Sequence, residues 1–338
     1  MYWQGRNVLI TGGAGQIGSH LAARLVALGA NIRIADNLWR GRISNLYAHG
    51  RPIIDLDHEV LRTDLIEYGS CVNVTRNVDT VFHLADVVAG INYVFGNQLS
   101  LFNTNVVLNS HMLKAAIENS VPNYIYVGSA CSYPRERQMQ LNPPPFREAD
   151  AYPASPESSY GWSKLMGEYE CGLAQQEGLL NIGILRFHNV YGPHCELSPE
   201  RSQVIPALIR KAIRYPKEPF VVWGSGAQRR AFVYVRDVVD ALVSVRESGM
   251  NRGVIQIGPD YSTSIKTIAE KIVKMSGKPI AIEYDVSRPE GDMDRTADWT
   301  RAREILNWRP STAIDQGLQL TYEWCEMYLH GGCIQPSS

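Results

Sequence analysis

The sequence predicts an α/β protein, built on a doubly wound parallel sheet with a smaller C-terminal α/β lobe. Short apolar strands alternate with helical patterns through the first half of the 338 residues, an order typical of parallel sheets. A glycine-rich turn joins the first strand to the first helix. After Gly192-Pro193, short helices and strands alternate with Pro and Gly turns, which indicates a second, smaller lobe.

The elements of the first half follow one another in a regular order. Most of the strands are short runs rich in Val, Ile and Leu, as expected for strands buried on both faces. The first helix ends at Gly29, a residue that suits a helix C-terminus. The predicted strands cover residues 7–11, 31–36, 58–63, 78–84, 124–127 and 182–186, and the predicted helices cover 17–28, 99–119 and about 158–176.

The glycine-rich turn carries a dinucleotide-binding pattern. Gly12, Gly15 and Gly18 allow a tight turn and let backbone amides approach a pyrophosphate at the positive end of the helix. Asp36 ends the second strand about 20 residues further on, where a carboxylate bonds both ribose hydroxyls and repels a 2′-phosphate. The sequence therefore predicts a Rossmann-type sheet that binds NAD rather than NADP.

Other residues at strand ends extend this predicted cofactor site. Asp64 follows the strand at 58–63 and can bond the adenine amine, although a solvated turn aspartate is an equal alternative. Ala85 follows the strand at 78–84, where a small side chain lets the backbone approach the cofactor. The predicted NAD contacts are Gly12, Gly15, Gln16, Ile17, Gly18, Asp36, Asn37, Asp64, Leu65, Leu84, Ala85, Tyr160 and Lys164.

Two short motifs, at 128–134 and 160–164, contain candidate catalytic groups. Tyr160 and Lys164 place a phenol and an ammonium on one face of a predicted helix, where the positive charge is expected to lower the phenol pKa. Such a phenolate can remove a proton from a sugar hydroxyl at neutral pH. Ser129 and Cys131 place a hydroxyl and a thiol two residues apart. A thiol near positive charge is a suitable base, and a small buried hydrophobe is the alternative interpretation of Cys131.

With these motifs, the chain resembles the extended short-chain dehydrogenase/reductase family, specifically its nucleotide-sugar epimerases and dehydratases. The resemblance covers nearly the whole chain and implies that Ser129, Tyr160 and Lys164 are the catalytic serine, tyrosine and lysine of that family. The segments 186–193 and 224–232 look like those that hold the sugar diphosphate. The implied substrate-binding residues are Asn189, Arg230 and Arg295.

The resemblance also implies a domain organisation. Residues 1–192 are expected to form the NAD-binding Rossmann domain and to receive a later strand or helix from the C-terminal half. Residues 193–330 are expected to form the nucleotide-sugar-binding lobe, and 331–338 a C-terminal tail. Relatives pair two long helices from each of two copies, so a homodimer is expected.

The run 129–134 resembles the corresponding run of epimerases that act at C3 and C5 of GDP-mannose. The predicted reaction oxidises the sugar at C4, and the transient ketone acidifies the protons at C3 and C5. Cys131 then acts as an acid/base group, and returned hydride restores the alcohol, so that NAD is regenerated in each cycle.

Those epimerases have a second acid/base group, a lysine just beyond the Tyr-Gly-Pro motif. An ungapped reading places Ser198 there, and no lysine occurs between Lys164 and Lys211. The candidates nearby in the sequence are His194, Cys195 and Glu200.

Three alternatives stay open from the sequence. A UDP-hexose 4-epimerase needs only the tyrosine, the serine and the cofactor, and the missing lysine favours it. A 4,6-dehydratase usually has an acidic pair just after the serine, and Ala130-Cys131-Ser132 offers no carboxylate. A catalytically silent NAD-binding regulator would have no need to retain Ser129, Tyr160 and Lys164 together.

Composition excludes several other classes. The chain has 33 Lys and Arg against 34 Asp and Glu, which gives no electrostatic reason to expect nucleic acid or a membrane surface as a partner. No apolar run approaches the roughly 20 residues of a spanning helix, and no signal-peptide pattern precedes the first strand, so a cytoplasmic location is expected. The six cysteines and eight histidines show no metal-ligand spacing, and no metal is expected.

Overall fold

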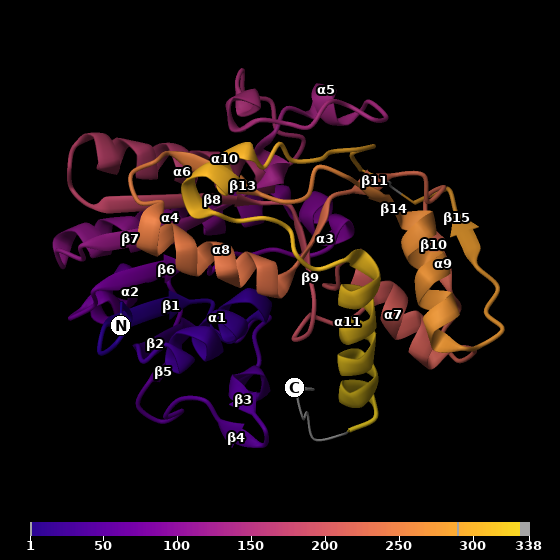
Figure 1. Ribbon diagram of the computed structural model, residues 1–338, viewed down its shortest axis with the longest axis horizontal. Coiled ribbons are helices and arrows are strands. Elements are labelled where there is room, and N and C mark those ends of the chain that lie inside the picture. Colours follow the sequence, from indigo (N-terminus) through magenta and orange to yellow (C-terminus); the bar gives the residue numbers. More distant parts are fainter. Residues whose placement is uncertain (1, 289–290, 332–338) are drawn as a thin grey trace.

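A computed structural model describes residues 2–288 and 291–331 and confirms the predicted α/β fold class (Figure 1). The centre is a seven-stranded parallel sheet in the order β13-β8-β7-β6-β1-β2-β5. Its strands are β1 (Asn7–Thr11), β2 (Asn31–Asp36), β5 (Val60–Arg62), β6 (Thr80–His83), β7 (Asn123–Ser129), β8 (Asn181–Phe187) and β13 (Val254–Ile257).

One strand of this sheet comes from the C-terminal half of the chain. β13 pairs in parallel with β8, and Ile255 lies opposite Leu185. Helix α8 (Val235–Ser248) precedes β13 and packs on the sheet beside α1 (Gln16–Ala27). The sheet therefore includes residues beyond position 192. The predicted domain boundary at 192 stays a prediction. Of the predicted tail 331–338, all but Gly331 lies outside the described residues.

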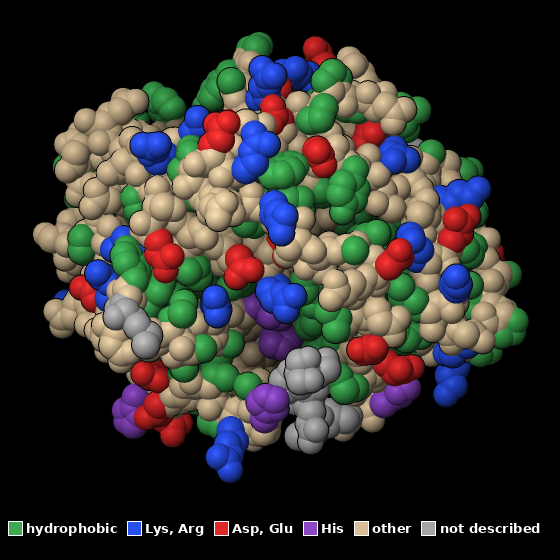
Figure 2. Space-filling view, viewed as in Figure 1, with side chains coloured by type: hydrophobic (Ala, Val, Ile, Leu, Met, Phe, Trp, Pro, Cys, Tyr) green, Lys and Arg blue, Asp and Glu red, His purple; other side chains and the backbone are tan. Residues whose placement is uncertain are grey.

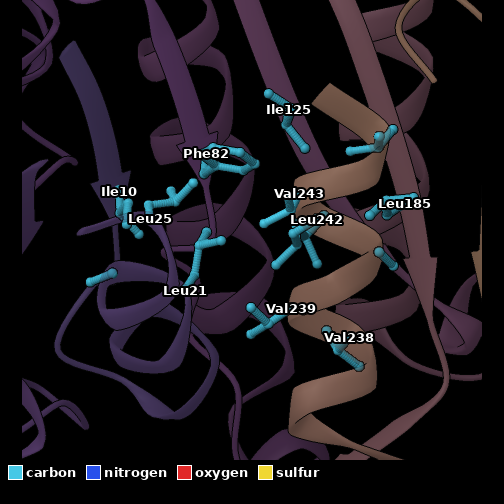
Figure 3. Close-up of a cluster of buried hydrophobic side chains, with 14 of the residues drawn as sticks. Ile10, Leu21, Leu25, Phe82, Ile125, Leu185, Val238, Val239, Leu242 and Val243 are labelled. Atoms are coloured by element: carbon cyan, nitrogen blue, oxygen red, sulfur yellow. The ribbon is translucent and has the colours of Figure 1, made fainter. Parts of the chain in front are cut away.

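Helices cover both faces of the sheet. Figure 3 shows apolar side chains of α1 and α8 on this face of the sheet, with Leu21 and Leu25 of α1 beside Ile10 and Leu242 of α8 between that group and Leu185, each fully buried. The opposite face is covered by α2 (Tyr68–Thr75), α4 (Gln98–Glu118) and α6 (Ser159–Gln176). Because both faces are covered, the central strands β1, β6, β7 and β8 are buried along most of their length rather than at alternate residues.

The smaller lobe packs around a second apolar cluster. Its helices α7 (Val204–Arg214), α9 (Ile265–Ser276) and α11 (Ile314–Leu329) lie on one side of the molecule in Figure 1, beside the β10 (Val221–Trp223) and β15 (Glu283–Asp285) pair. In α7 the buried Ile205, Leu208, Ile209 and Ala212 recur at helical spacing, which gives the helix one apolar face.

The remaining elements are short. They are η1 (Ile43–Leu46), β3 (Tyr47–Ala48), β4 (Arg51–Pro52), α3 (Ile91–Gly96), η2 (Ala130–Ser132), α5 (Arg135–Gln138), η3 (Glu148–Ala151), β9 (Asn189–Tyr191), β11 (Arg229–Arg230), β12 (Phe232–Tyr234), β14 (Thr263–Ser264) and α10 (Thr300–Leu306).

Charge is distributed evenly over the face drawn in Figure 2, where positive and negative side chains are interspersed. Over residues 2–288 and 291–331, no helix is both long and apolar enough to span a bilayer. The same residues contain no group of three His, Cys, Asp or Glu side chains placed to hold a metal ion.

A buried ion pair joins helix α6 to strand β8. Arg186 donates to both carboxylate oxygens of Glu168, at 2.5 and 3.0 Å, and both side chains are almost fully buried. Arg186 also donates to the Glu148 carbonyl at 2.9 Å. Such a pair fixes the helix relative to the strand, since neither charge has access to water.

We expect Glu168→Gln to lower the free energy of unfolding by about 3 kcal/mol, because it leaves the Arg186 charge buried without its counter-charge. Urea unfolding followed by circular dichroism measures the change. Glu177→Gln, at the exposed end of the same helix, serves as the control and is expected to change stability by less than about 0.5 kcal/mol. Equal stability of the two variants would contradict this prediction.

Candidate active site

One cavity of about 780 Å³ lies at the carboxyl ends of the central strands, and the lobe forms its far wall. Val222, Trp223 and Ile265 contribute from the lobe. The site residues predicted from the sequence all line this cavity: Gly12, Gly15, Gln16, Ile17, Gly18, Asp36, Asn37, Asp64, Leu65, Leu84, Ala85, Ser129, Cys131, Tyr160, Lys164, Asn189, Arg230 and Arg295. Open α/β sheets bind ligands at this edge.

The glycine turn needs residues without a side chain. Gly12 has φ +66°, and a Cβ atom there would lie 3.0 Å from the backbone of Ala85. A Cβ atom on Gly18 would lie 2.3 Å from the Gly12 carbonyl oxygen, so α1 packs against the turn at a distance that only glycine permits. The N-terminus of α1 therefore begins at the cavity wall, where its amides suit a pyrophosphate.

Asp36 is fixed at the end of β2 by two backbone amides. Its carboxylate accepts hydrogen bonds from Ala14 N at 3.0 Å and Leu38 N at 2.8 Å. Burial raises the pKa of this carboxyl, and the two amide hydrogen bonds oppose that rise. Asn37 and Asp64 accept from amides two residues ahead, at 3.0 and 3.1 Å, so both stabilise turns at the cavity rim. The glycine cradle and the carboxylate together fit NAD.

We expect Asp36→Ala to weaken NAD binding about ten- to hundredfold, since hydrogen bonds to a charged group contribute about 1.5–3 kcal/mol. The same change removes the repulsion of a 2′-phosphate and narrows the preference for NAD over NADP. Isothermal titration with each cofactor measures both effects. Asp57→Ala, outside the cavity, is the control. Tighter binding of NADP than of NAD by the unmodified protein would contradict the assignment.

A buried hydrogen-bond chain holds the ends of β1 and β6 together. The Thr11 hydroxyl oxygen accepts from the amides of Leu84 and Ala85, both at 3.1 Å. Its proton is therefore donated to Nδ1 of His83 at 2.8 Å, and His83 Nε2–H is donated to Asn109 Oδ1 at 2.8 Å. Burial lowers the pKa of His83 to about 3, so the ring is neutral at pH 7. His83 thus positions the cavity wall rather than titrating.

The motifs at 128–134 and 160–164 meet because Gly161 lets α6 approach η2. A Cβ atom on Gly161 would lie 2.2 Å from the Cys131 carbonyl oxygen. The Ser158 hydroxyl accepts from Gly161 N at 3.2 Å and starts the helix at this point. In this arrangement the Ser129 hydroxyl is hydrogen-bonded to the phenol of Tyr160, and Cys131 N donates to Ser129 Oγ at 3.2 Å.

Lys164 is held by a carboxylate that sequence reasoning did not assign. Its Nζ lies 2.5 Å from Oδ2 of Asp86 and donates to the Val127 carbonyl at 2.7 Å. Both side chains of the pair are almost fully buried. Burial raises the pKa of Asp86, and the Lys164 charge opposes that rise. The only sequence feature that points to Asp86 is its position just beyond the end of a predicted strand, which is similar to the position of Asp36.

This ion pair corrects one expectation. The pKa of Tyr160 is not lowered by Lys164; burial raises it well above the ordinary value, and the nearby Asp86 and Cys131 raise it further. The Asp86 charge neutralises the Lys164 charge close to the phenol. The hydrogen bond from Ser129 and the charge of Arg40 act in the opposite direction. Arg40, which donates to the Val88 carbonyl at 2.9 Å, had no signal in the sequence motifs.

Arg295 connects the thiol to the predicted substrate residues. Its Nη2 lies 3.7 Å from Cys131 Sγ and 3.2 Å from Asn189 Oδ1, and its Nη1 lies 2.9 Å from Asp292 Oδ2. Arg230 donates to the Asp292 carbonyl at 2.6 Å. Burial, followed by the like charge of Arg295, lowers the pKa of Arg230. Two guanidinium groups in one wall, that of the buried Arg295 and that of the half-buried Arg230, are suited to a diphosphate.

The candidates for a second acid/base group are placed differently from one another. His194 bonds Ser19 Oγ at 2.8 Å, and burial lowers its pKa to about 3. Cys195 is buried with its sulphur 3.8 Å from that of Cys325. His194 and Glu200 line the cavity, whereas Cys195 and Ser198 do not. Packing contacts therefore account for His194 and Cys195, and Glu200 is the remaining candidate from the sequence.

Gln16 has a structural contact in addition to its place in the cavity wall. Its Nε2 donates to the carbonyls of Gly192 at 2.6 Å and Pro193 at 3.2 Å. These bonds join α1 to the chain that leaves β9 for the lobe. The side chain therefore helps to fix the lobe beside the cofactor turn.

Comparisons with known proteins identify the family of the chain. A family model described as the NAD dependent epimerase/dehydratase family matches residues 8–258. GDP-mannose 3,5-epimerase 1 of Oryza sativa subsp. indica is 32% identical over 328 residues, covering 96% of this chain and 83% of that protein. UDP-N-acetyl-alpha-D-glucosaminuronate decarboxylase of Bacillus cytotoxicus is 30% identical over 332 residues, covering 94% and 97%.

A solved structure extends the likeness to the fold. UDP-glucose 4-epimerase of Thermotoga maritima superposes with a TM-score of 0.84 at 26% identity, covering 96% of this chain and 99% of that one. The resemblance to extended short-chain dehydrogenases/reductases and the expectation of NAD are thereby confirmed. The chain belongs to the NAD dependent epimerase/dehydratase family, and NAD is its cofactor.

Proposed function

We propose that the protein is a nucleotide-sugar epimerase that inverts C3 and C5 of a GDP-mannose-like substrate through a transient 4-keto sugar. The position of Cys131 carries this proposal. Its thiol lies in the same cavity as the Ser129–Tyr160 pair, with the Arg295 guanidinium 3.7 Å away. A guanidinium at this distance can donate a hydrogen bond to the sulphur. The likeness to the rice GDP-mannose 3,5-epimerase supports the same substrate class.

The first step is oxidation at C4. When bound, NAD supplies the hydride acceptor and a positive charge on its oxidised ring. Gly12, Gly15 and Gly18 would hold its pyrophosphate, and Asp36 its ribose. Tyr160 accepts the proton of the sugar O4, and the Ser129 hydroxyl bonds the same oxygen. Burial raises the pKa of Tyr160 and favours the neutral phenol, whereas the positive charge that bound NAD would bring favours the phenolate that accepts this proton.

The second step is inversion beside the ketone. The carbonyl at C4 acidifies the protons at C3 and C5, and the Cys131 thiolate removes one of them to give an enolate and a thiol. Protonation of the same carbon from the opposite face inverts it. Asn189 and Arg230, together with Arg295, would hold the diphosphate while the ring reacts. Return of the hydride then restores the alcohol.

Solvent deuterium exchange with a panel of GDP- and UDP-sugars, followed by NMR, tests this proposal. We expect deuterium at C3 and C5 of GDP-mannose. Inversion at C4 without solvent label would contradict the proposal and identify a 4-epimerase. A 4-keto-6-deoxy product would identify a 4,6-dehydratase.

A UDP-hexose 4-epimerase is the second candidate. The superposition on UDP-glucose 4-epimerase of Thermotoga maritima favours it, since that reaction needs only Ser129, Tyr160 and NAD. A dehydratase has less support, because the residues after Ser129 provide no carboxylate. A silent regulator has less support too, since Ser129, Tyr160 and Lys164 meet in one cavity.

We also propose a homodimer formed through α4 and α6. Along α6 the exposed Trp162, Met166, Tyr169 and Leu173 recur at helical spacing and form an apolar stripe, in which Tyr169 is 63% exposed. α4 packs against α6 and exposes Leu99. Two such helix pairs from two copies would form a four-helix bundle.

Tyr169→Glu tests the homodimer by placing two charges in that bundle. We expect the unmodified protein to sediment as a dimer and the variant as a monomer at micromolar concentration. Tyr47→Glu, an exposed tyrosine outside α4 and α6, is the control and should stay dimeric. A monomeric unmodified protein would contradict the proposed dimer.

A further inference from the structure

Two carboxyl groups meet in the cavity wall near Cys131. Glu157 immediately precedes the Ser158 cap of α6, and Asp292 lies in the segment between β15 and α10. Both line the cavity, and their side chains are hydrogen-bonded to each other. Two carboxyl groups in such contact hold one proton between them, because two bare carboxylates repel.

The surroundings of the pair locate that proton. Asp292 is 8% exposed, and its Oδ1 is buried without an N–H or O–H donor among the described residues. Its Oδ2 accepts from Arg295 at 2.9 Å. Glu157 Oε1 lies 3.4 Å from Arg135 Nε, the one arginine that faces it from α5. A proton shared between Glu157 and Asp292 would satisfy the buried Asp292 Oδ1.

This contact makes Glu157 a group that titrates near neutrality. Burial, followed by the hydrogen bond and the negative charge of Asp292, raises the pKa of Glu157 to about 7, and Arg135 opposes the rise. The other charges that act on the pair are those of Arg295 and Arg230. A carboxyl of this kind can donate a proton at neutral pH and accept one afterwards.

The pair also has a defined relation to the thiol. Arg295 lies between them, with Nη1 on Asp292 and Nη2 3.7 Å from Cys131 Sγ. Glu157 is three residues before Tyr160, so its backbone is fixed by the same helix start that places the phenol. The carboxyl pair and the thiol therefore flank one guanidinium in the wall of a single cavity.

We propose that Glu157, paired with Asp292, is the second proton-transfer group of the epimerisation and acts on the ring face opposite Cys131. This proposal rests on the proposed function. The Cys131 thiolate takes the proton from the ring carbon and becomes a thiol, leaving an enolate. Glu157 gives its proton to the same carbon from the other face and becomes a carboxylate. Exchange with water returns both groups to their starting forms. A carboxyl group here replaces the lysine that the sequence lacks between Lys164 and Lys211.

Glu157→Gln tests the proposal with GDP-mannose in deuterated water. We expect inversion at C3 and C5 to fall at least about 100-fold, since a positioned acid or base contributes 10²–10⁴-fold. Deuterium should still enter with retained configuration, because Cys131 can remove a proton and return deuterium to the same face. Reduction of bound NAD should stay within about twofold, which also shows that the variant is folded. Glu177→Gln, at the exposed end of α6, is the matched control.

Asp292→Asn gives an independent readout. The amide can donate to the Glu157 carboxylate and stabilise its charged form, so the falling limb of the pH profile for inversion should move to lower pH by about one unit. A residue with only a structural function would lower the rate at every pH without moving this limb.

Each negative result has its own consequence for the proposed function and for the assignment of Glu157. No ring-carbon label in the unmodified protein overturns the proposed function, and the assignment of Glu157 with it. Normal label in the unmodified protein together with normal inversion in Glu157→Gln overturns the assignment alone. An unmoved pH limb in Asp292→Asn also overturns the assignment.

Discussion

Tyr160→Phe is expected to slow every reaction that begins at C4 by about 10²–10⁴-fold. The phenol is the group that accepts the O4 proton, and it lies hydrogen-bonded to Ser129 at the carboxyl edge of the sheet. Phenylalanine keeps the ring and its packing, so folding and NAD binding should persist. The measurement is the single-turnover rate at which bound NAD is reduced by GDP-mannose.

The control for this prediction lies on the same helix. Tyr169→Phe removes a hydroxyl from an exposed tyrosine of α6 and should leave the rate of NAD reduction unchanged. If Tyr160→Phe reduces NAD at the rate of the unmodified protein, another group accepts the O4 proton.

Cys131→Ala is expected to reduce solvent label at C3 and C5 by at least about 100-fold while leaving NAD reduction intact. The reason is a separation of tasks within the cavity. Oxidation at C4 uses Ser129 and Tyr160, whereas the thiol acts only after the ketone has formed. NMR of the sugar after incubation in deuterated water measures the label, and the absorbance of bound NADH measures the oxidation.

Cys171→Ala provides the matched control, since Cys171 is a buried thiol of α6 outside the cavity. It should take up label at the normal rate. A fully active Cys131→Ala would show that this cysteine is a packing residue and would leave the 4-epimerase as the better description.

Local patterns allowed much of the fold and the cofactor site to be predicted. The glycine turn and Asp36 could be identified from the sequence because their function follows from the backbone conformation of a few adjacent residues. The Ser129 and Tyr160 motifs were identifiable for the same reason. Gly161, the residue after Tyr160, also permits the close contact between the two motifs.

What could not be predicted depends on partners distant in the sequence. Asp86 acquires its function from Lys164, and Glu157 acquires its function from Asp292. Arg40 affects the phenol only because the fold brings the segment after β2 close to Tyr160. The sequence therefore predicts a lowered pKa for Tyr160, whereas the structure raises it. The reason is that Asp86, the counter-charge of Lys164, could not be identified from the sequence.

The place of β13 in the sheet has the same kind of cause. Its residues form a short apolar run that fits a strand of either lobe, and only pairing with β8 decides between them. Pairing of this kind is set by packing of α8 beside α1, which joins segments from the two halves of the chain.

The most direct measurement uses GDP-mannose that carries deuterium at C4. The reaction is quenched during turnover, and the cofactor released from the protein is analysed by mass spectrometry. Transient oxidation at C4 by the site at Ser129 and Tyr160 predicts that the reduced cofactor carries one deuterium while epimerised sugar accumulates. Epimerised sugar with a cofactor that never becomes reduced or labelled would contradict oxidation at C4.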